Sequence, residues 1–119
     1  MSERKSIIKD KTFFFAKRII KLYQYLIETK KEFVIGKQLL RSGTAVGALV
    51  REAQNAESKA DFIHKLAIAQ KECDESLYWL ELLFESGYLK EKEFISIQGE
   101  ASDLLKMIRS AIITTKSRK

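Results

Sequence analysis

Hydrophobic side chains recur every three or four residues in four long stretches of the chain, and this spacing predicts four amphipathic α-helices. The expected helices span about residues 11–29, 36–55, 59–86 and 90–115. Their inward stripes are mainly apolar and consist of Phe15, Ile19, Leu22 and Leu26; Leu39, Val46, Val50 and Ala53; Phe62, Leu66, Ala69, Cys73, Ser76, Leu80 and Leu83; and Ile97, Ala101, Leu104, Ile108 and Ile112. Long helices with short connections favour one all-α domain over residues 1–119, an up-down-up-down antiparallel four-helix bundle. A helical hairpin exchanged between chains and an open helical array are the alternatives.

Both ends of the third helix carry capping residues. Ser58 precedes the stretch and Asp61 follows three residues later, a pair typical of a helix N-terminus. Gly87 stands just after the last apolar position, where glycine commonly ends a helix. The final Lys-Ser-Arg-Lys continues no apolar stripe, so residues 116–119 are expected to form a frayed basic tail.

The first helix has a second apolar stripe beside the inward one. Its members also follow helical spacing and are Phe13, Ala16, Ile20, Tyr23 and Ile27. A wide apolar arc is typical of a helix that is buried on two sides. The first helix is therefore a candidate for contact between copies of the chain.

Gly43 and Gly47 lie one turn apart inside the second helix, although the chain contains no proline and few glycines. Each glycine weakens a helix by about 1 kcal/mol relative to alanine, which calls for a compensating contact. With Ser42, Ala45 and Ala48 they form a smooth face that a neighbouring backbone can approach closely. Close packing within one subunit is favoured, and contact between subunits stays open. A phosphate-binding glycine loop is disfavoured because no Gly-Lys-Ser/Thr follows and no strand precedes.

The net charge of +6 is concentrated in the first half of the chain. Residues 1–60 contain 13 Lys and Arg against 6 Asp and Glu, whereas residues 61–119 contain 9 against 10. Two clusters of cations stand out, Lys17, Arg18 and Lys21 on the first helix and Lys37, Arg41 and Arg51 on the second. If the two helices are neighbours, these side chains merge into a basic ribbon that suits the phosphates of RNA or DNA.

No pattern of catalytic or metal-binding residues supports an enzyme or a cofactor. His64 is the only histidine and lacks the second histidine or cysteine pair that a metal site needs. Cys73 lies on an apolar stripe, and a single cysteine fits a reducing compartment. Trp79 is a candidate for an interface or for the core. Because neither a signal peptide nor a membrane-spanning run is present, we expect a cytoplasmic protein.

The middle of the chain carries a series of short motifs in a fixed order. They are Arg41-Ser42, the small residues Gly43 to Gly47, Glu52-Ala53-Gln54, Ser58-Lys59 with Asp61-Phe62, Ile68-Ala69, Glu75 with Tyr78-Trp79-Leu80, and Glu85 to Leu89. In these motifs the sequence resembles a bacterial four-helix bundle family that includes proteins encoded in intervening sequences of 23S rRNA genes. It is also similar to the accessory variability determinant of diversity-generating retroelements.

The resemblance implies a bundle that assembles into a ring of five subunits with a basic surface. The retroelement relatives bind a reverse transcriptase and nucleic acid, which makes a protein-binding adaptor the alternative to direct RNA or DNA binding. Leu49 departs from the family, whose members usually carry asparagine at that position. The polar contact of the asparagine is lost here, and a neighbouring helix gains apolar area instead.

Overall fold

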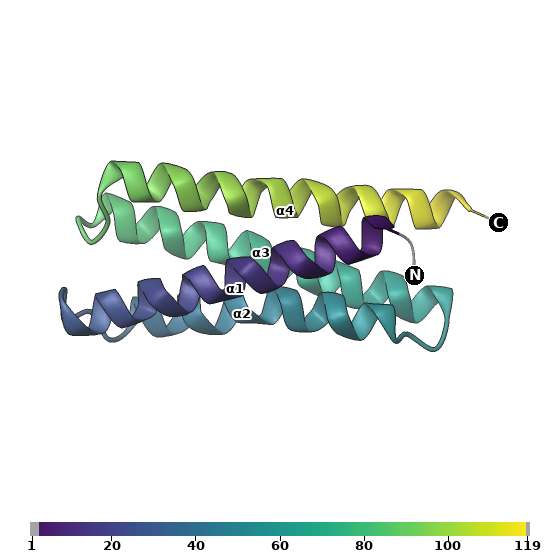
Figure 1. Cartoon of the computed structure of the whole chain (residues 1–119), viewed down its shortest axis with the longest axis horizontal. Coiled ribbons are helices and arrows are strands. Elements are labelled where there is room, and N and C mark those ends of the chain that lie inside the picture. The colour runs from purple at the N-terminus through teal and green to yellow at the C-terminus, as the bar shows by residue number, and fades with distance from the viewer. Residues whose placement is uncertain (1–2, 119) are drawn as a thin grey trace.

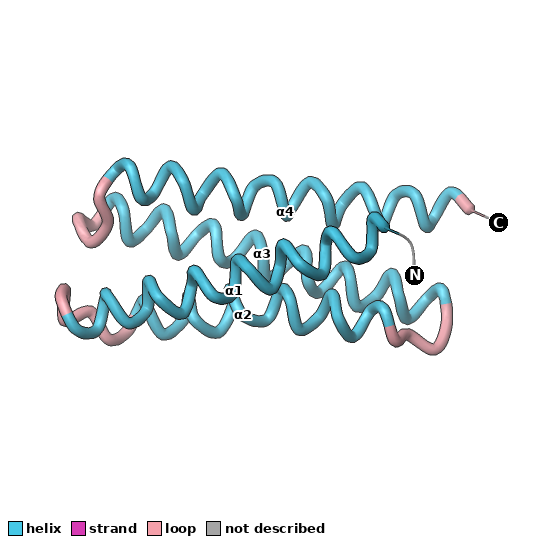
Figure 2. Tube along the Cα trace, viewed as in Figure 1, coloured by secondary structure: helices cyan, strands magenta, loops and turns pink. Residues whose placement is uncertain are grey.

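The four stretches with helical spacing each form one α-helix in the computed structural model, which describes residues 3–118 and the side chains of residues 7–118. In chain order the helices are α1 (Glu3–Glu28), α2 (Ile35–Gln54), α3 (Lys59–Glu85) and α4 (Glu91–Ser117). Short loops connect them, and the described residues contain no strand (Figure 2). The prediction of an all-α four-helix bundle is confirmed.

The helices run side by side along a rod of 50 × 21 × 20 Å. Successive helices alternate in direction, so that the α1–α2 and α3–α4 connections lie at one end and the α2–α3 connection lies at the other (Figure 1). α2 packs on both α1 and α3, α3 packs on α4, and α1 meets α4 less extensively than it meets α2. The outer surface of the α1–α2 pair is therefore one long side of the rod.

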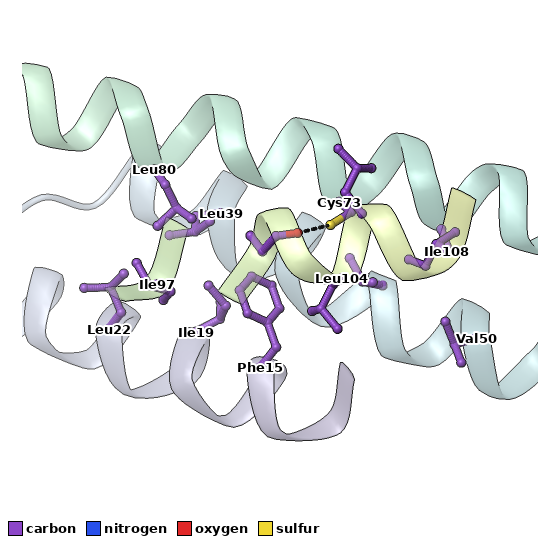
Figure 3. Packing of buried hydrophobic residues seen from close by; sticks show 14 of the residues in the cluster. Phe15, Ile19, Leu22, Leu39, Val50, Cys73, Leu80, Ile97, Leu104 and Ile108 are labelled. Atoms are coloured by element: carbon purple, nitrogen blue, oxygen red, sulfur yellow. Dashed lines mark hydrogen bonds between the residues drawn. The ribbon is translucent and has the colours of Figure 1, made fainter. Parts of the chain in front are cut away.

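The predicted inward stripes form the core between the four helices (Figure 3). All of their residues are buried except Phe62, which is half-buried against the same cluster. The buried hydroxyl of Ser76 donates to the buried hydroxyl of Ser42 across the α2–α3 contact, with 2.9 Å between their Oγ atoms. The Cys73 thiol donates to the carbonyl oxygen of Ala101 at 3.3 Å, which joins α3 to α4 (Figure 3).

Both predicted caps of α3 are present. The Oγ of Ser58 accepts the backbone N–H of Asp61 at 3.0 Å. At the other end Gly87 has φ of +87°, and the N–H of Tyr88 reaches back to the carbonyl of Leu83 at 2.9 Å. These contacts satisfy backbone groups that a helix end otherwise leaves unpaired.

Two helices are longer than their periodicity predicts. α1 begins at Glu3 rather than near Lys11, and Ile8 and Thr12 are both buried on the same side as Phe15. Thr12 interrupts the apolar pattern, but its hydroxyl donates to the carbonyl of Ile8 at 2.9 Å and is thereby satisfied inside the helix. α4 continues through Ser117, so most of the expected tail is helical, and Lys119 lies outside the described residues.

The start of α2 is capped by an unexpected residue. Its N-cap position is Val34, which has no capping side chain, and the carboxylate of Glu32 takes that role. Its two oxygens accept the backbone N–H groups of Val34, Ile35 and Gly36 at 3.2, 3.0 and 2.7 Å. Burial acts to raise the pKa of the Glu32 carboxyl, but the three backbone hydrogen bonds outweigh it and hold that pKa below its ordinary value.

Replacing Glu32 with glutamine is expected to lower the free energy of unfolding by about 2 kcal/mol at pH 7, because charge-assisted bonds to a helix N-terminus are lost. Since the folded-state pKa lies below the unfolded value, the stabilisation is fully present above about pH 4.3 and is lost as the pH falls through the folded pKa. Urea unfolding of both proteins at several pH values measures the difference. Glu28→Gln, which changes the exposed last residue of α1, is the control. If the difference in unfolding free energy between the two proteins stays constant down to low pH, the capping role of the Glu32 carboxylate is contradicted.

Candidate nucleic-acid interface

The two glycines of α2 set the distance between α2 and α1. A Cβ on Gly43 would lie only 2.8 Å from Cγ1 of Ile19, and one on Gly47 would lie 3.2 Å from the backbone oxygen of Thr12. Both positions therefore face α1 of the same chain. The close approach compensates the helix penalty of glycine through the dispersion contacts of the packed atoms.

A shallow groove of about 690 Å³ runs along the outer side of this contact. Its floor and walls include Phe13 and Ile20 of α1 and Thr44, Gly47, Ala48 and Arg51 of α2. Because Gly47 and Ala48 have little or no side chain, the surface is recessed where the two helices approach each other. Phe13 remains 54% exposed, which is a large exposed area for an aromatic side chain.

Two cations from different helices converge on Phe13. Nζ of Lys17 and Cζ of Arg51 each lie 5.9 Å from the centroid of its ring, within the range of a cation–π contact. Lys17 and Arg51 are themselves exposed. The α1–α2 contact thus brings together cations that are far apart in sequence around one exposed aromatic ring.

The other predicted cations divide between two faces. Lys37 and Arg41 are exposed on α2, and Arg41 shares an outer stripe with Thr44, Ala48 and Arg51. Arg18 and Lys21 instead line a groove beside Leu89 and Glu93, on the α4 side of α1. The first-helix cluster is therefore split, and only Lys17 lies with the cations of α2.

Arg18 is engaged within the chain. Its guanidinium binds Oε1 of Glu93 at 3.1 Å and Oε1 of Glu100 at 3.2 Å, and it also donates to the hydroxyl of Ser96. Glu100 is partly buried, and its other carboxylate oxygen has no partner. These ion pairs connect α1 to α4, and they indicate that Arg18 stabilises the packing of the two helices.

One end of the α1–α2 groove is acidic. Glu52, Glu57 and Asp61 line it, and the groove is also lined by the cations Lys9 and Lys65. The ammonium of Lys65 pairs with Glu52 at 3.1 Å, and Asp61 accepts the backbone N–H of Glu57 at 3.2 Å. The carboxylates therefore gather at the end of the groove near the α2–α3 connection, and Arg41, which does not line the groove, lies exposed on α2 away from that end.

From the sequence we expect Phe13 in an apolar stripe, and its position next to two cations is not predicted. The spacing of Phe13 and Lys17, one helical turn apart, is the only local signal of this arrangement. The contribution of Arg51 depends on the packing of α2 against α1, which no local pattern contains.

Leu49 and Trp79 are half-buried and pack against the core cluster. The indole N–H of Trp79 donates to Glu75 at 3.1 Å, and its ring meets that of Tyr78 edge-on. A role for Leu49 and Trp79 between subunits stays a prediction.

His64 and Cys73, the two residues considered for metal binding or catalysis, lie in different environments. His64 is exposed, whereas Cys73 is fully buried, and burial together with the charge of Asp74 raises the pKa of its thiol to about 12. Within residues 7–118, no three side chains of His, Cys, Asp or Glu gather closely enough to hold a metal ion. In the described part of the chain, no helix has the length and apolar character needed to cross a membrane.

Comparisons with known proteins agree with this architecture. The sequence pattern of the family described as 23S rRNA-intervening sequence protein matches residues 4–110. A crystal structure from Bacteroides thetaiotaomicron, of a protein of the S23 ribosomal protein family with unknown function, is similar with a TM-score of 0.90 and 47% sequence identity. The similarity covers 92% of this chain and 97% of that chain. No curated protein matches the chain. The protein therefore belongs to the 23S rRNA-intervening sequence protein family.

Proposed function

We propose that the protein is a non-enzymatic nucleic-acid-binding protein that holds the phosphate backbone of RNA or DNA on the outer face of α1 and α2. The observation that carries the proposal is the convergence of Lys17 and Arg51 from two helices on the exposed ring of Phe13, which lines a groove together with Arg51. Arg41 and Lys37 extend the cationic stripe along α2.

Long-range electrostatics favours the same face. The excess of positive charge lies in residues 1–60, and α1 and α2 lie within that part of the chain. Cations on the surface of a rigid helix pair attract phosphates without selecting a base sequence. The expected interaction is therefore broad in sequence and sensitive to salt.

Self-association is part of the proposal. Large apolar side chains on other faces, including Ile95 and Ile113 of α4, are more than half exposed and support contact between copies. A ring of several subunits repeats the cationic face, so one strand can engage more than one copy. Light scattering is expected to give a mass several times that of the 13.8 kDa chain.

The salt dependence of affinity tests the binding function. If three phosphates of a single strand are contacted, raising the salt from about 50 to about 200 mM is expected to weaken binding about 20-fold through counterion release. Fluorescence anisotropy with labelled RNA and DNA oligonucleotides measures this change. The proposal fails if neither binds at low salt, or if the affinity does not respond to salt.

A further inference from the structure

We propose that the α1–α2 groove is a binding site for unpaired nucleotides, with one base stacked on Phe13 while Lys17, Arg41 and Arg51 hold the flanking phosphates. This inference rests on the proposed nucleic-acid binding and adds the substrate class, single-stranded rather than duplex. The geometry that supports it is an exposed aromatic ring with a cation from each helix over it, 5.9 Å from its centroid.

The ring of Phe13 is placed to meet a base. Its 54% exposure leaves ring surface available to a ligand, and the groove of about 690 Å³ beside it has room for a nucleotide. Sequence-tolerant single-strand binding commonly combines exposed aromatic rings with a basic groove that follows the backbone. A duplex keeps its bases stacked inside, so a ring on the surface of a straight helix pair cannot reach a base face.

The charges around the groove determine the direction in which a bound strand is expected to run. Phosphates are attracted to Lys17 and Arg51, each 5.9 Å from the centre of the ring, and to Arg41 farther along the same stripe of α2. Glu57 and Asp61 at the other end of the groove repel them. The strand is therefore expected to leave Phe13 toward Arg41 rather than toward the α2–α3 connection.

Phe14 provides a matched control within the same helix. It is the next residue, has the same side chain and is also 54% exposed. Its groove lies on the α4 side and is lined by three carboxylates, Asp10, Glu100 and Asp103, against one cation, Lys11, an environment that disfavours phosphates. The two phenylalanines thus differ in their charged neighbours and not in type or exposure.

The experiment compares Phe13→Ala and Phe14→Ala in the full chain, using an unstructured RNA oligonucleotide and a hairpin duplex of equal charge. Phe13→Ala is expected to weaken single-strand binding about tenfold, the effect typical of one lost stacked base, and to leave duplex binding unchanged. Phe14→Ala leaves single-strand binding as in the wild type, and Phe13→Trp restores it. Circular dichroism and light scattering confirm that each variant keeps its helices and its mass.

The outcomes separate this inference from the proposed function. If the wild type binds single strands and duplex equally and Phe13→Ala changes neither, nucleic-acid binding stands and the stacking site is wrong. If Phe13→Ala lowers the solution mass, Phe13 lies between copies of the chain and the stacking site is also wrong. If the wild type binds no nucleic acid at all, the proposed function itself fails.

Discussion

Replacing Gly43 with leucine is expected to lower the free energy of unfolding by about 3 kcal/mol, the largest effect anticipated for a single substitution in α2. A Cβ at this position already meets Cγ1 and Cγ2 of Ile19 at 2.8 and 3.0 Å. Ile19 is fully buried and branched at Cβ, so its contacting atoms have little room to move. The longer side chain must therefore push α1 away from α2. Urea unfolding followed by circular dichroism measures the loss.

Two further variants distinguish overpacking from a general effect of changing glycine. Gly99 lies inside α4, is exposed and has no atom near its would-be Cβ, so Gly99→Ala is expected to stabilise the protein by about 1 kcal/mol through helix propensity. Ile19→Ala combined with Gly43→Leu makes space for the new side chain. The double variant should be more stable than the sum of the two single changes indicates. Strict additivity would contradict the contact between Gly43 and Ile19.

The reversal of two cations on α2 is expected to have the second large effect. Arg41→Glu with Arg51→Glu should weaken RNA binding about 100-fold at low salt, because each lost phosphate contact contributes about 1.4 kcal/mol and the new carboxylates repel the strand. The dependence of affinity on salt should become shallower in the same variant. Anisotropy titrations at two salt concentrations measure both changes.

Lys90→Glu with Lys92→Glu is the matched control for this reversal. It makes the same change in net charge at exposed positions around the start of α4, which lies away from the α1–α2 groove. Binding should then weaken much less than in the α2 variant. Equal losses of RNA affinity in the two double variants would show that net charge alone governs binding and that the α1–α2 face is not the binding site.

The bundle and its core follow from local patterns in the sequence. An apolar residue every three or four positions defines the buried side of each helix regardless of its neighbours, which is why the inward stripes are predicted correctly. Ser58 and Gly87 also act on backbone groups only a few residues away. The early start of α1 is missed because Thr12 breaks the pattern, although its hydroxyl is satisfied within the helix. Glu32 is missed because a carboxylate before the usual cap position reaches the helix only through the loop conformation.

The candidate interface is less predictable because its members meet only through tertiary packing. The cations are visible in the sequence, but their division between two faces is not. Arg18 pairs with Glu93 and Glu100 of α4, which lie 75 and 82 residues later in the sequence. Arg51 meets Phe13 because Gly43 and Gly47 let the two helices approach. Family similarity supplies the fold and the expectation of a basic surface, whereas the residues that form the groove come from the structure.

Locating the bound nucleic acid on the protein tests the role of the α1–α2 groove most directly. Photo-crosslinking a uridine-rich RNA to the wild-type protein, followed by mass spectrometry of the digested adduct, identifies the residues in contact with bases. We expect crosslinks in the peptide of α1 that contains Phe13 and in the segment of α2 around Arg51. Crosslinks confined to α3 and α4 would contradict this role.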